Sequence, residues 1–173
     1  MDTNRITGLA LAISPVAAIV IWFIMGFGLL GGVGPDDPQK YIAELGANST
    51  AVKFLFPFVT LLFLIAIGGL GYIKKSMDGG SGSYIAGFAW FLILLGAAGQ
   101  LGEVAFTLAL AEAAHDANWA VASSMFAGGQ AIGAVTTAFS MLGIALFGVA
   151  IWQRKNFSPI VACLMFVAGI YTL

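Results

Sequence analysis

The feature that most constrains the fold is a series of long stretches without Asp, Glu, Lys or Arg, interrupted once, at Glu103. A helix needs roughly 20 apolar residues to cross about 30 Å of hydrocarbon. In lipid, backbone polar groups must be satisfied internally, which excludes loops and open strands. We therefore predict one all-α domain, residues 1–173, that forms a polytopic transmembrane helix bundle of about five spans. The predicted spans are residues 8–32, 54–73, 84–110, 130–152 and 158–173.

The fourth stretch, residues 117–153, is too long for one simple span, because as a helix it would measure about 55 Å. We divide it near Gly128-Gly129 and expect residues 118–127 to lie at the membrane interface. A re-entrant or hairpin arrangement is the alternative.

Three segments between the spans are predicted loops, and the glycine-rich one reads as a flexible turn. Pro15 lies inside the first span, where it predicts either a kink or a helix that starts later. The predicted loops are residues 35–53, 74–83 and 111–118.

The composition supports lipid as the main solvent of the chain. Hydrophobic residues make up 60% of it and charged residues 9%, whereas a soluble domain has about 25% charged residues. The net charge of -1 leaves no broad basic face, so nucleic acid is not an expected partner. The single cysteine cannot form an intramolecular disulfide.

The basic residues predict how the chain sits in a cell membrane. Short loops on the cytoplasmic side are enriched in Lys and Arg. Alternation of the spans puts five of the seven basic residues on the face that carries the amino terminus. We therefore predict a cytoplasmic amino terminus and an outside carboxyl terminus. The five residues are Arg5, Lys74, Lys75, Arg154 and Lys155.

Glu103 is the most informative residue, because a carboxylate within a span is costly and indicates a functional site by default. Gln100 and Thr107 lie three residues before it and four after it, on one helical face that Gly96 and Gly99 continue. One interpretation is a polar pathway or ligand contact inside the bundle. The other is a helix–helix interface, in which glycines permit close approach and polar groups bond across it.

A second group of polar residues lies on the predicted outer face. Glu112 and His115 share a helical face, and acidic neighbours could complete a weak cation site. A solvated acidic rim is the favoured alternative, since the chain has one histidine and few of the required ligands. No catalytic set is visible, and no cofactor is indicated. The weak metal candidates are Glu112, His115, Asp116, Asp36 and Asp37.

Glycine spacing predicts contact with other membrane proteins or with a second copy of this chain. Gly28 and Gly32 form one small-xxx-small motif, and Gly129 and Gly133 form another. Such motifs allow helices to approach closely.

The layout resembles an uncharacterised family of small bacterial and archaeal multi-spanning membrane proteins, known only as a domain of unknown function. The resemblance implies a multi-spanning helical fold and supplies neither an activity nor site residues. Members usually have a sixth span, whereas this sequence ends at Leu173. The similar features are Asn4-Arg5, Gly8, the stretch Gly143–Gly148, Arg154 and Ser158-Pro159.

Two functional classes remain open, and a membrane enzyme that uses Glu112 and His115 is a distant third. The favoured class is a non-catalytic accessory or structural subunit of a larger membrane complex, suggested by the glycine-rich faces and the few polar groups in the spans. The alternative is a small transporter or channel with a polar path along Gln100, Glu103 and Thr107. The facing helices are expected to offer this path only Thr60, Thr136, Thr137 and Ser140.

Overall fold

The computed structural model describes residues 3–154 and 158–171, and every regular element in those ranges is a helix. This confirms the predicted all-α bundle. A short π-helix, η1, continues the first helix. The elements are α1 (Thr3–Phe23), η1 (Ile24–Leu29), α2 (Pro38–Ala47), α3 (Ser49–Ser76), α4 (Ser83–His115), α5 (Trp119–Arg154) and α6 (Pro159–Tyr171).

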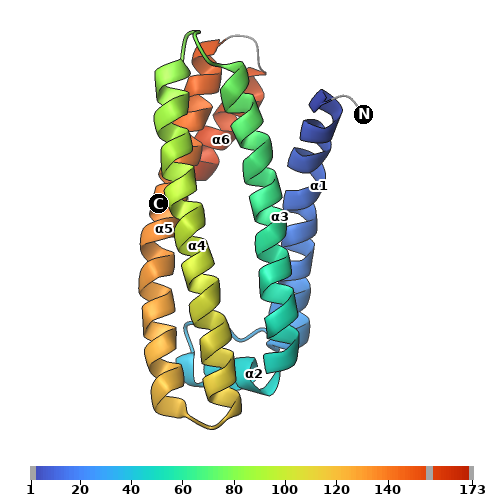
Figure 1. Cartoon of the computed structure of the whole chain (residues 1–173), viewed down its shortest axis with the longest axis vertical. Helices are drawn as coiled ribbons and strands as arrows, with labels where there is room; N and C mark the ends of the chain where they lie inside the picture. The colour runs from blue at the N-terminus through green and yellow to red at the C-terminus, as the bar shows by residue number, and fades with distance from the viewer. Residues whose placement is uncertain (1–2, 155–157, 172–173) are drawn as a thin grey trace.

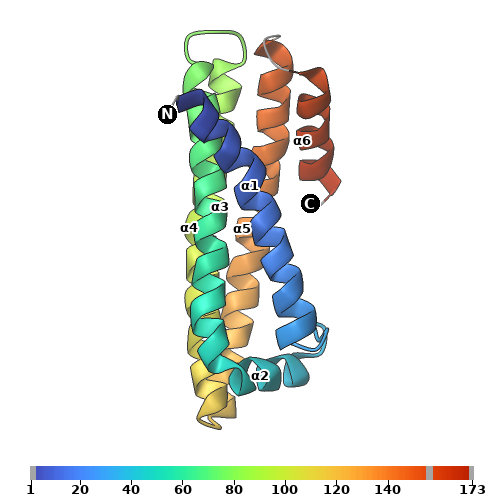
Figure 2. The same cartoon turned by 90° about the vertical axis from the view of Figure 1, so that its right-hand side faces the viewer.

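Four long helices run along the long axis of the molecule, with α1 beside α3 and α4 beside α5 (Figure 1). The short α2 lies across the end that also holds the turn between α4 and α5, and α6 lies along the opposite half of α5 (Figure 2). The most extensive contact joins α4 to α5, and α3 contacts both α1 and α4.

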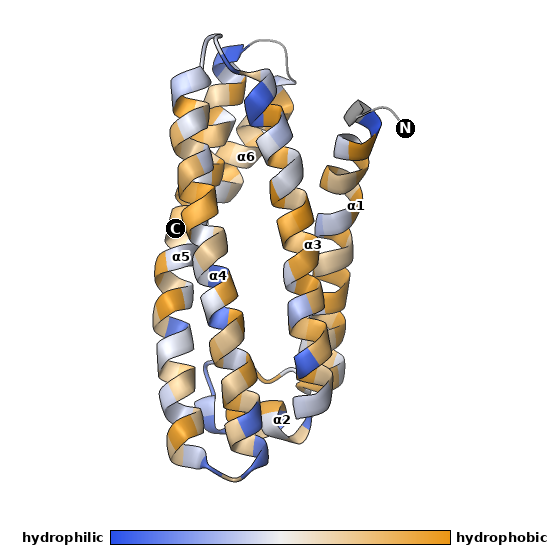
Figure 3. Cartoon of the chain, viewed as in Figure 1, coloured by the Kyte–Doolittle hydropathy of each residue, from blue (hydrophilic) through white to orange (hydrophobic). Residues whose placement is uncertain are grey.

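The length and hydropathy of the helices identify a multi-pass membrane protein. Four helical segments are long and apolar enough to cross a bilayer: Arg5–Leu29, Ser49–Ser76, Ser83–His115 and Trp119–Arg154. Hydrophobic residues dominate their middles, and hydrophilic residues gather at the two ends (Figure 3). Only 11% of the most apolar window of Ser49–Ser76 is buried within the protein. Lipid would cover such a surface, which would be unfavourable in water.

The predicted fifth crossing stays a prediction. The helix in that region, α6, covers the 13 residues Pro159–Tyr171. At 1.5 Å per residue it extends about 20 Å, which is shorter than the hydrocarbon layer. Residues 172 and 173, the end of the predicted span, lie outside the described residues.

The predicted loop over residues 35–53 is wrong, because it contains α2 and the first turn of α3. The Asp37 side chain accepts a hydrogen bond from the Lys40 amide, and Pro38 occupies the first turn of α2. Both features are typical of a helix start. The turn predicted between α3 and α4 is present, and Gly79 and Gly82 adopt positive φ angles of 72° and 80° there.

The division near Gly128-Gly129 is also wrong, because α5 is one continuous helix. A Cβ atom built on Gly128 would lie 2.9 Å from the Phe106 ring, and one on Gly129 would lie 3.3 Å from the Phe106 Cβ. The two glycines therefore accommodate an aromatic side chain of α4 and do not break the helix. Helix α4 itself continues to His115, so most of the predicted loop 111–118 is helical.

Pro15 does not delay the start of the first helix, because α1 begins at Thr3 and runs through it. The backbone changes further along, in η1. There the Leu30 amide donates to the Met25 carbonyl at 2.9 Å, five residues back. This spacing is that of a π-helix, a rare element that is frequent at functional sites.

The end of the bundle that carries the amino terminus is held by contacts between distant segments. The Arg154 guanidinium donates to the Ser76 carbonyl at 3.3 Å, and the Ser81 hydroxyl donates to the Gln153 carbonyl at 2.9 Å. Lys74 pairs with Asp78 at 2.9 Å. Basic segments far apart in the sequence therefore share one end, as alternation of the spans requires. Lys155 lies outside the described residues, and the predicted cytoplasmic location of this end stays a prediction.

Glycines allow α4 and α5 to pack closely along their length. A Cβ atom on Gly96 would lie 2.8 Å from the Thr136 carbonyl oxygen, and one on Gly143 would lie 2.9 Å from the Ala89 carbonyl oxygen. A Cβ atom on Gly99 would collide with the Thr136 side chain. Close approach of this kind is the usual basis of helix association in membranes.

We expect Gly96→Ala to lower the free energy of unfolding by about 1–3 kcal/mol, because the added methyl would meet backbone that cannot move alone. Gly87→Ala on the same helix is the matched control, since no described atom outside the local helix lies within 4 Å of a Cβ there. Unfolding of both variants in mixed detergent micelles measures the difference. Equal loss in the two variants would contradict the packing account.

Candidate functional site

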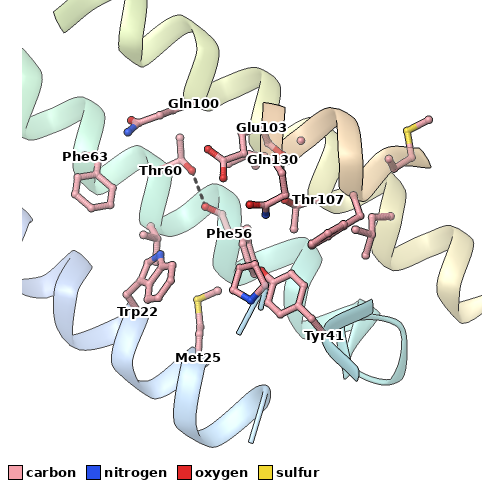
Figure 4. A pocket seen from close by; sticks show the side chains of 17 residues that line it. Trp22, Met25, Tyr41, Phe56, Thr60, Phe63, Gln100, Glu103, Thr107 and Gln130 are labelled. Atoms are coloured by element: carbon pink, nitrogen blue, oxygen red, sulfur yellow. Dashed lines mark hydrogen bonds between the residues drawn. The ribbon is translucent and has the colours of Figure 1, made fainter. Parts of the chain in front are cut away.

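A cavity of about 320 Å³ lies between the helices, on the half of the bundle nearer α2. Its wall includes side chains from α1, η1, α2, α3, α4 and α5 (Figure 4). Much of the wall is apolar, and six side chains besides the Trp22 indole bring polar groups to it. These are Tyr41, Thr60, Gln100, Glu103, Thr107 and Gln130.

Helix α4 contributes Gln100, Glu103 and Thr107, the three residues that the helical spacing predicted on one face. All three side chains are half-buried, and Gln100 lies near the middle of the helix. The Thr107 hydroxyl donates to the Glu103 carbonyl at 3.0 Å, so only its oxygen remains as an acceptor for another group. The structure thus brings the three residues to one cavity, and their functional role stays a prediction.

The two sequence interpretations of this face apply to different parts of it. Gly96 and Gly99 pack against Thr136 and Ser140 of α5 and form the helix interface. The polar residues further along α4 turn to the cavity. Thr136 and Ser140 are buried in the interface and do not line this cavity, so they do not extend a polar path.

The Glu103 carboxylate has no hydrogen-bonding or ionic partner among the described side chains. The lysines of α2 and of the start of α3 pair with other carboxylates. Lys40 pairs with Asp37 at 3.1 Å, and Lys53 pairs with Glu112. A Cβ atom on Gly133 would lie 2.8 Å from the carboxyl carbon, so the glycine makes room for this group beside α5. A carboxylate in this setting requires a proton, a polar ligand or a cation.

Aromatic residues and one methionine form much of the wall opposite α4. Trp22 and Met25 come from α1 and η1, and Phe56 and Phe63 come from α3. Thr60 of α3 lies among them, and its hydroxyl donates to the Phe56 carbonyl at 2.8 Å. The cavity therefore places one carboxyl group and a few neutral polar groups opposite a largely aromatic surface.

Sequence reasoning missed two polar residues of the cavity, Gln130 and Tyr41. Gln130 was placed at the end of a predicted span, and Tyr41 was placed in a predicted loop. The Asp37-Pro38 pair, which marks a helix start, could have revealed that Tyr41 sits on a helix. No comparable signal was available for Gln130, because the direction in which it points depends on how α5 is rotated against α4.

Tyr41 closes the cavity at the α2 end. Its ring packs edge-on against the Phe126 ring of α5, with centroids 6.0 Å apart. Burial raises the pKa of Tyr41 above its usual value, and the negative charge of Glu103 adds to the effect. The phenol therefore remains a hydrogen-bond donor at neutral pH.

The weak metal candidates do not assemble into a site. Within residues 3–154 and 158–171, no group of three or more His, Cys, Asp and Glu residues could hold a metal ion. Asp37 caps α2 and pairs with Lys40, while Glu112 pairs with Lys53 of α3. The second of these pairs joins α4 to α3 at the α2 end of the bundle.

No family model, no curated protein and no solved structure matches this chain. The resemblance to the uncharacterised multi-spanning family therefore stays a prediction. The cavity has to be interpreted from its own residues.

The Asp37 contacts predict a pH dependence at the start of α2. The hydrogen bonds from Lys40 and its charge hold the pKa of Asp37 below its usual value of 3.8. This stabilisation is present above that value and is lost as the pH falls through the lower pKa of the folded state. We expect the α2 amides to lose protection against hydrogen exchange in acid, once the rates are corrected for the intrinsic pH dependence of exchange. Asp37→Asn, which keeps a capping oxygen, should remove this pH response; an unchanged response would contradict the assignment.

Proposed function

We propose that this protein is a membrane-embedded carrier that binds a small molecule in the cavity between α1, α3, α4 and α5. One observation carries the proposal: an unpaired carboxyl group, two amides and two threonines from α3, α4 and α5 surround one cavity inside an otherwise apolar bundle. Polar residues inside a membrane bundle are costly, and they usually mark substrate or ion pathways. Bundle interiors are also a preferred place for ligand pockets.

The packing at the two ends of the bundle favours a carrier over an open channel. Beyond the cavity, the end near the amino terminus is filled by a core that includes Met77, Phe147 and Ile151, each almost fully buried. A continuous polar path would have to cross this core. The α2 end is also packed, by a core that includes Leu45, Val52 and Ala111, so entry or release of a ligand would require a conformational change, as in carriers.

The accessory-subunit interpretation loses much of the support that the glycine motifs gave it. Gly129 and Gly133 pack inside the chain, against Phe106 and Glu103 of α4. Gly32 lies beyond η1 in a turn with a φ angle of 77°, so it does not form a helical motif with Gly28. Of the two glycine motifs that the spacing predicted, one therefore packs against α4 of the same chain, and the other is not helical along its whole length.

We expect Thr107→Phe to abolish ligand binding, because the larger side chain would fill part of the cavity. Ala109→Phe is the matched control, since Ala109 is on the same helix, is exposed and does not line the cavity. The wild type and both variants are extracted gently from the same membranes. Native mass spectrometry then reports any small molecule that remains bound.

The carrier proposal expects a bound small molecule on the wild type and on Ala109→Phe, and none on Thr107→Phe. Equal binding to all three proteins would place the ligand outside the cavity. Other polypeptides at a fixed ratio, with no small molecule, would contradict the proposal and support the accessory-subunit class.

A further inference from the structure

A second cavity adjoins the first and has a different chemical character. It measures about 340 Å³ and lies against η1, the turn that follows it and α2. Five residues line both cavities: Trp22, Met25, Pro35, Tyr41 and Phe56. Because these side chains separate the two spaces, a ligand that moves them slightly could occupy both.

The second cavity is an apolar, partly aromatic groove that opens to the outside of the bundle, since Trp22, Phe23 and Phe27 in its wall are 58%, 60% and 71% exposed. Phe23 and Phe27 stack with ring centroids 6.0 Å apart, and both belong to its wall. The π-helical turn of η1 supplies Met25, Gly26 and Phe27 to the wall. The far end of η1 is anchored, because the Asn48 side-chain amide donates to the Leu29 carbonyl at 3.0 Å.

The charges around the two cavities select the sign of a ligand. Among the residues that the structure describes, Glu103 is the one side chain with a formal charge in either wall, and no Lys, Arg or His lines them. An anionic ligand would meet a carboxyl group and find no basic partner. A cation would meet that carboxyl group and the faces of Trp22, Tyr41 and Phe56, which attract cations through the ring quadrupole.

The remaining walls select the size and polarity of the ligand. Inorganic divalent cations prefer six to eight oxygen ligands including several carboxylates, and this cavity holds one carboxylate. An organic cation needs no such shell. Its apolar portion would fit the second cavity, whose wall is apolar and partly aromatic.

We propose that the two adjoining cavities bind one amphiphilic organic cation, an amine or quaternary ammonium compound. The cationic group lies at Glu103 between the side chains of Gln100 and Gln130. The apolar portion lies in the second cavity beside η1. This assignment rests on the proposed carrier function and names the ligand class of the same site.

Binding to the purified protein in phosphatidylcholine nanodiscs tests the charge requirement. The probes are benzyltrimethylammonium and neopentylbenzene, which have the same shape and differ in charge. Glu103→Gln keeps the shape of the side chain and removes its charge. Glu112→Gln is the matched control, because Glu112 lies on the same helix outside both cavities. Calorimetry measures the affinities, and empty nanodiscs correct for partition into lipid.

We expect Glu103→Gln to weaken benzyltrimethylammonium binding by about tenfold or more, the effect of about 1.4 kcal/mol. Glu112→Gln should leave that affinity unchanged, and neither substitution should alter the affinity for neopentylbenzene. Removal of an unpaired charge from the bundle is not expected to prevent folding, and circular dichroism of each variant checks this.

A second pair of variants tests the apolar half of the site. Gly26→Phe would fill the second cavity, while Gly28→Phe is the control in the same helix, because Gly28 lines neither cavity. In the described part of the chain, neither glycine has an atom outside the local helix within 4 Å of a built Cβ, so both positions have room for a side chain. Tetramethylammonium, which has no benzyl group, gives the affinity expected without the apolar half of the site. Gly26→Phe should lower the affinity for benzyltrimethylammonium to that value. Gly28→Phe should not.

The outcomes separate the ligand class from the carrier function. Equal binding of the charged and neutral probes, unaffected by Glu103→Gln, would overturn the cation assignment and leave a binding cavity in place. Absence of binding by folded wild-type protein would also overturn the cation assignment. Native mass spectrometry of small molecules bound to Thr107→Phe and Ala109→Phe would then test the carrier function separately.

Discussion

Helices α4 and α5 approach each other closely because glycines on both helices leave room for the neighbouring backbone. Gly96 and Gly143 each face a carbonyl group of the other helix at a distance that a larger residue could not maintain. In lipid, where burial of apolar side chains gives little advantage, such contact is a main source of helix association. Most other elements attach to this pair, α3 and α2 to α4 and α6 to α5, while α1 packs on α3. The same packing leaves space for the Glu103 carboxyl group beside Gly133.

The cavity exists because α1 and α3 do not pack against the α4–α5 pair as closely as those two helices pack against each other. Aromatic side chains of α1 and α3 extend toward α4, and Tyr41 of α2 closes the end. In the part of α4 that precedes Gln100, small residues bring α4 and α5 together, and large side chains fill that end of the bundle. Packed cores at the two ends of the bundle thus lie on either side of the polar groups. This arrangement supports a carrier site that opens only through a conformational change.

The sequence was sufficient to predict the helical class, because charge-free stretches in lipid have one regular solution. It also placed Gln100, Glu103 and Thr107 together, since their spacing depends only on the geometry of one helix. Gln130 and Tyr41 could not be assigned to the cavity in this way, because their positions depend on how separate elements rotate and dock. The predicted break in α5 failed for a related reason: Gly128 and Gly129 accommodate Phe106 from another helix, and spacing within one helix does not show that contact. Nothing in the local sequence indicated the π-helical turn of η1.

Thiol accessibility at the middle of α4 tests the central claim, that polar residues of the bundle line a hydrated cavity and do not face lipid. In a Cys163→Ser background, single cysteines replace Gln100, which lines the cavity, or the adjacent Leu101, whose side chain is 48% exposed and faces away from it. A water-soluble, charged thiol reagent needs a hydrated thiolate to react. We predict rapid labelling at position 100 and none at position 101 in intact membranes. Labelling at neither position, or at equal rates at both, would contradict a hydrated cavity at this depth.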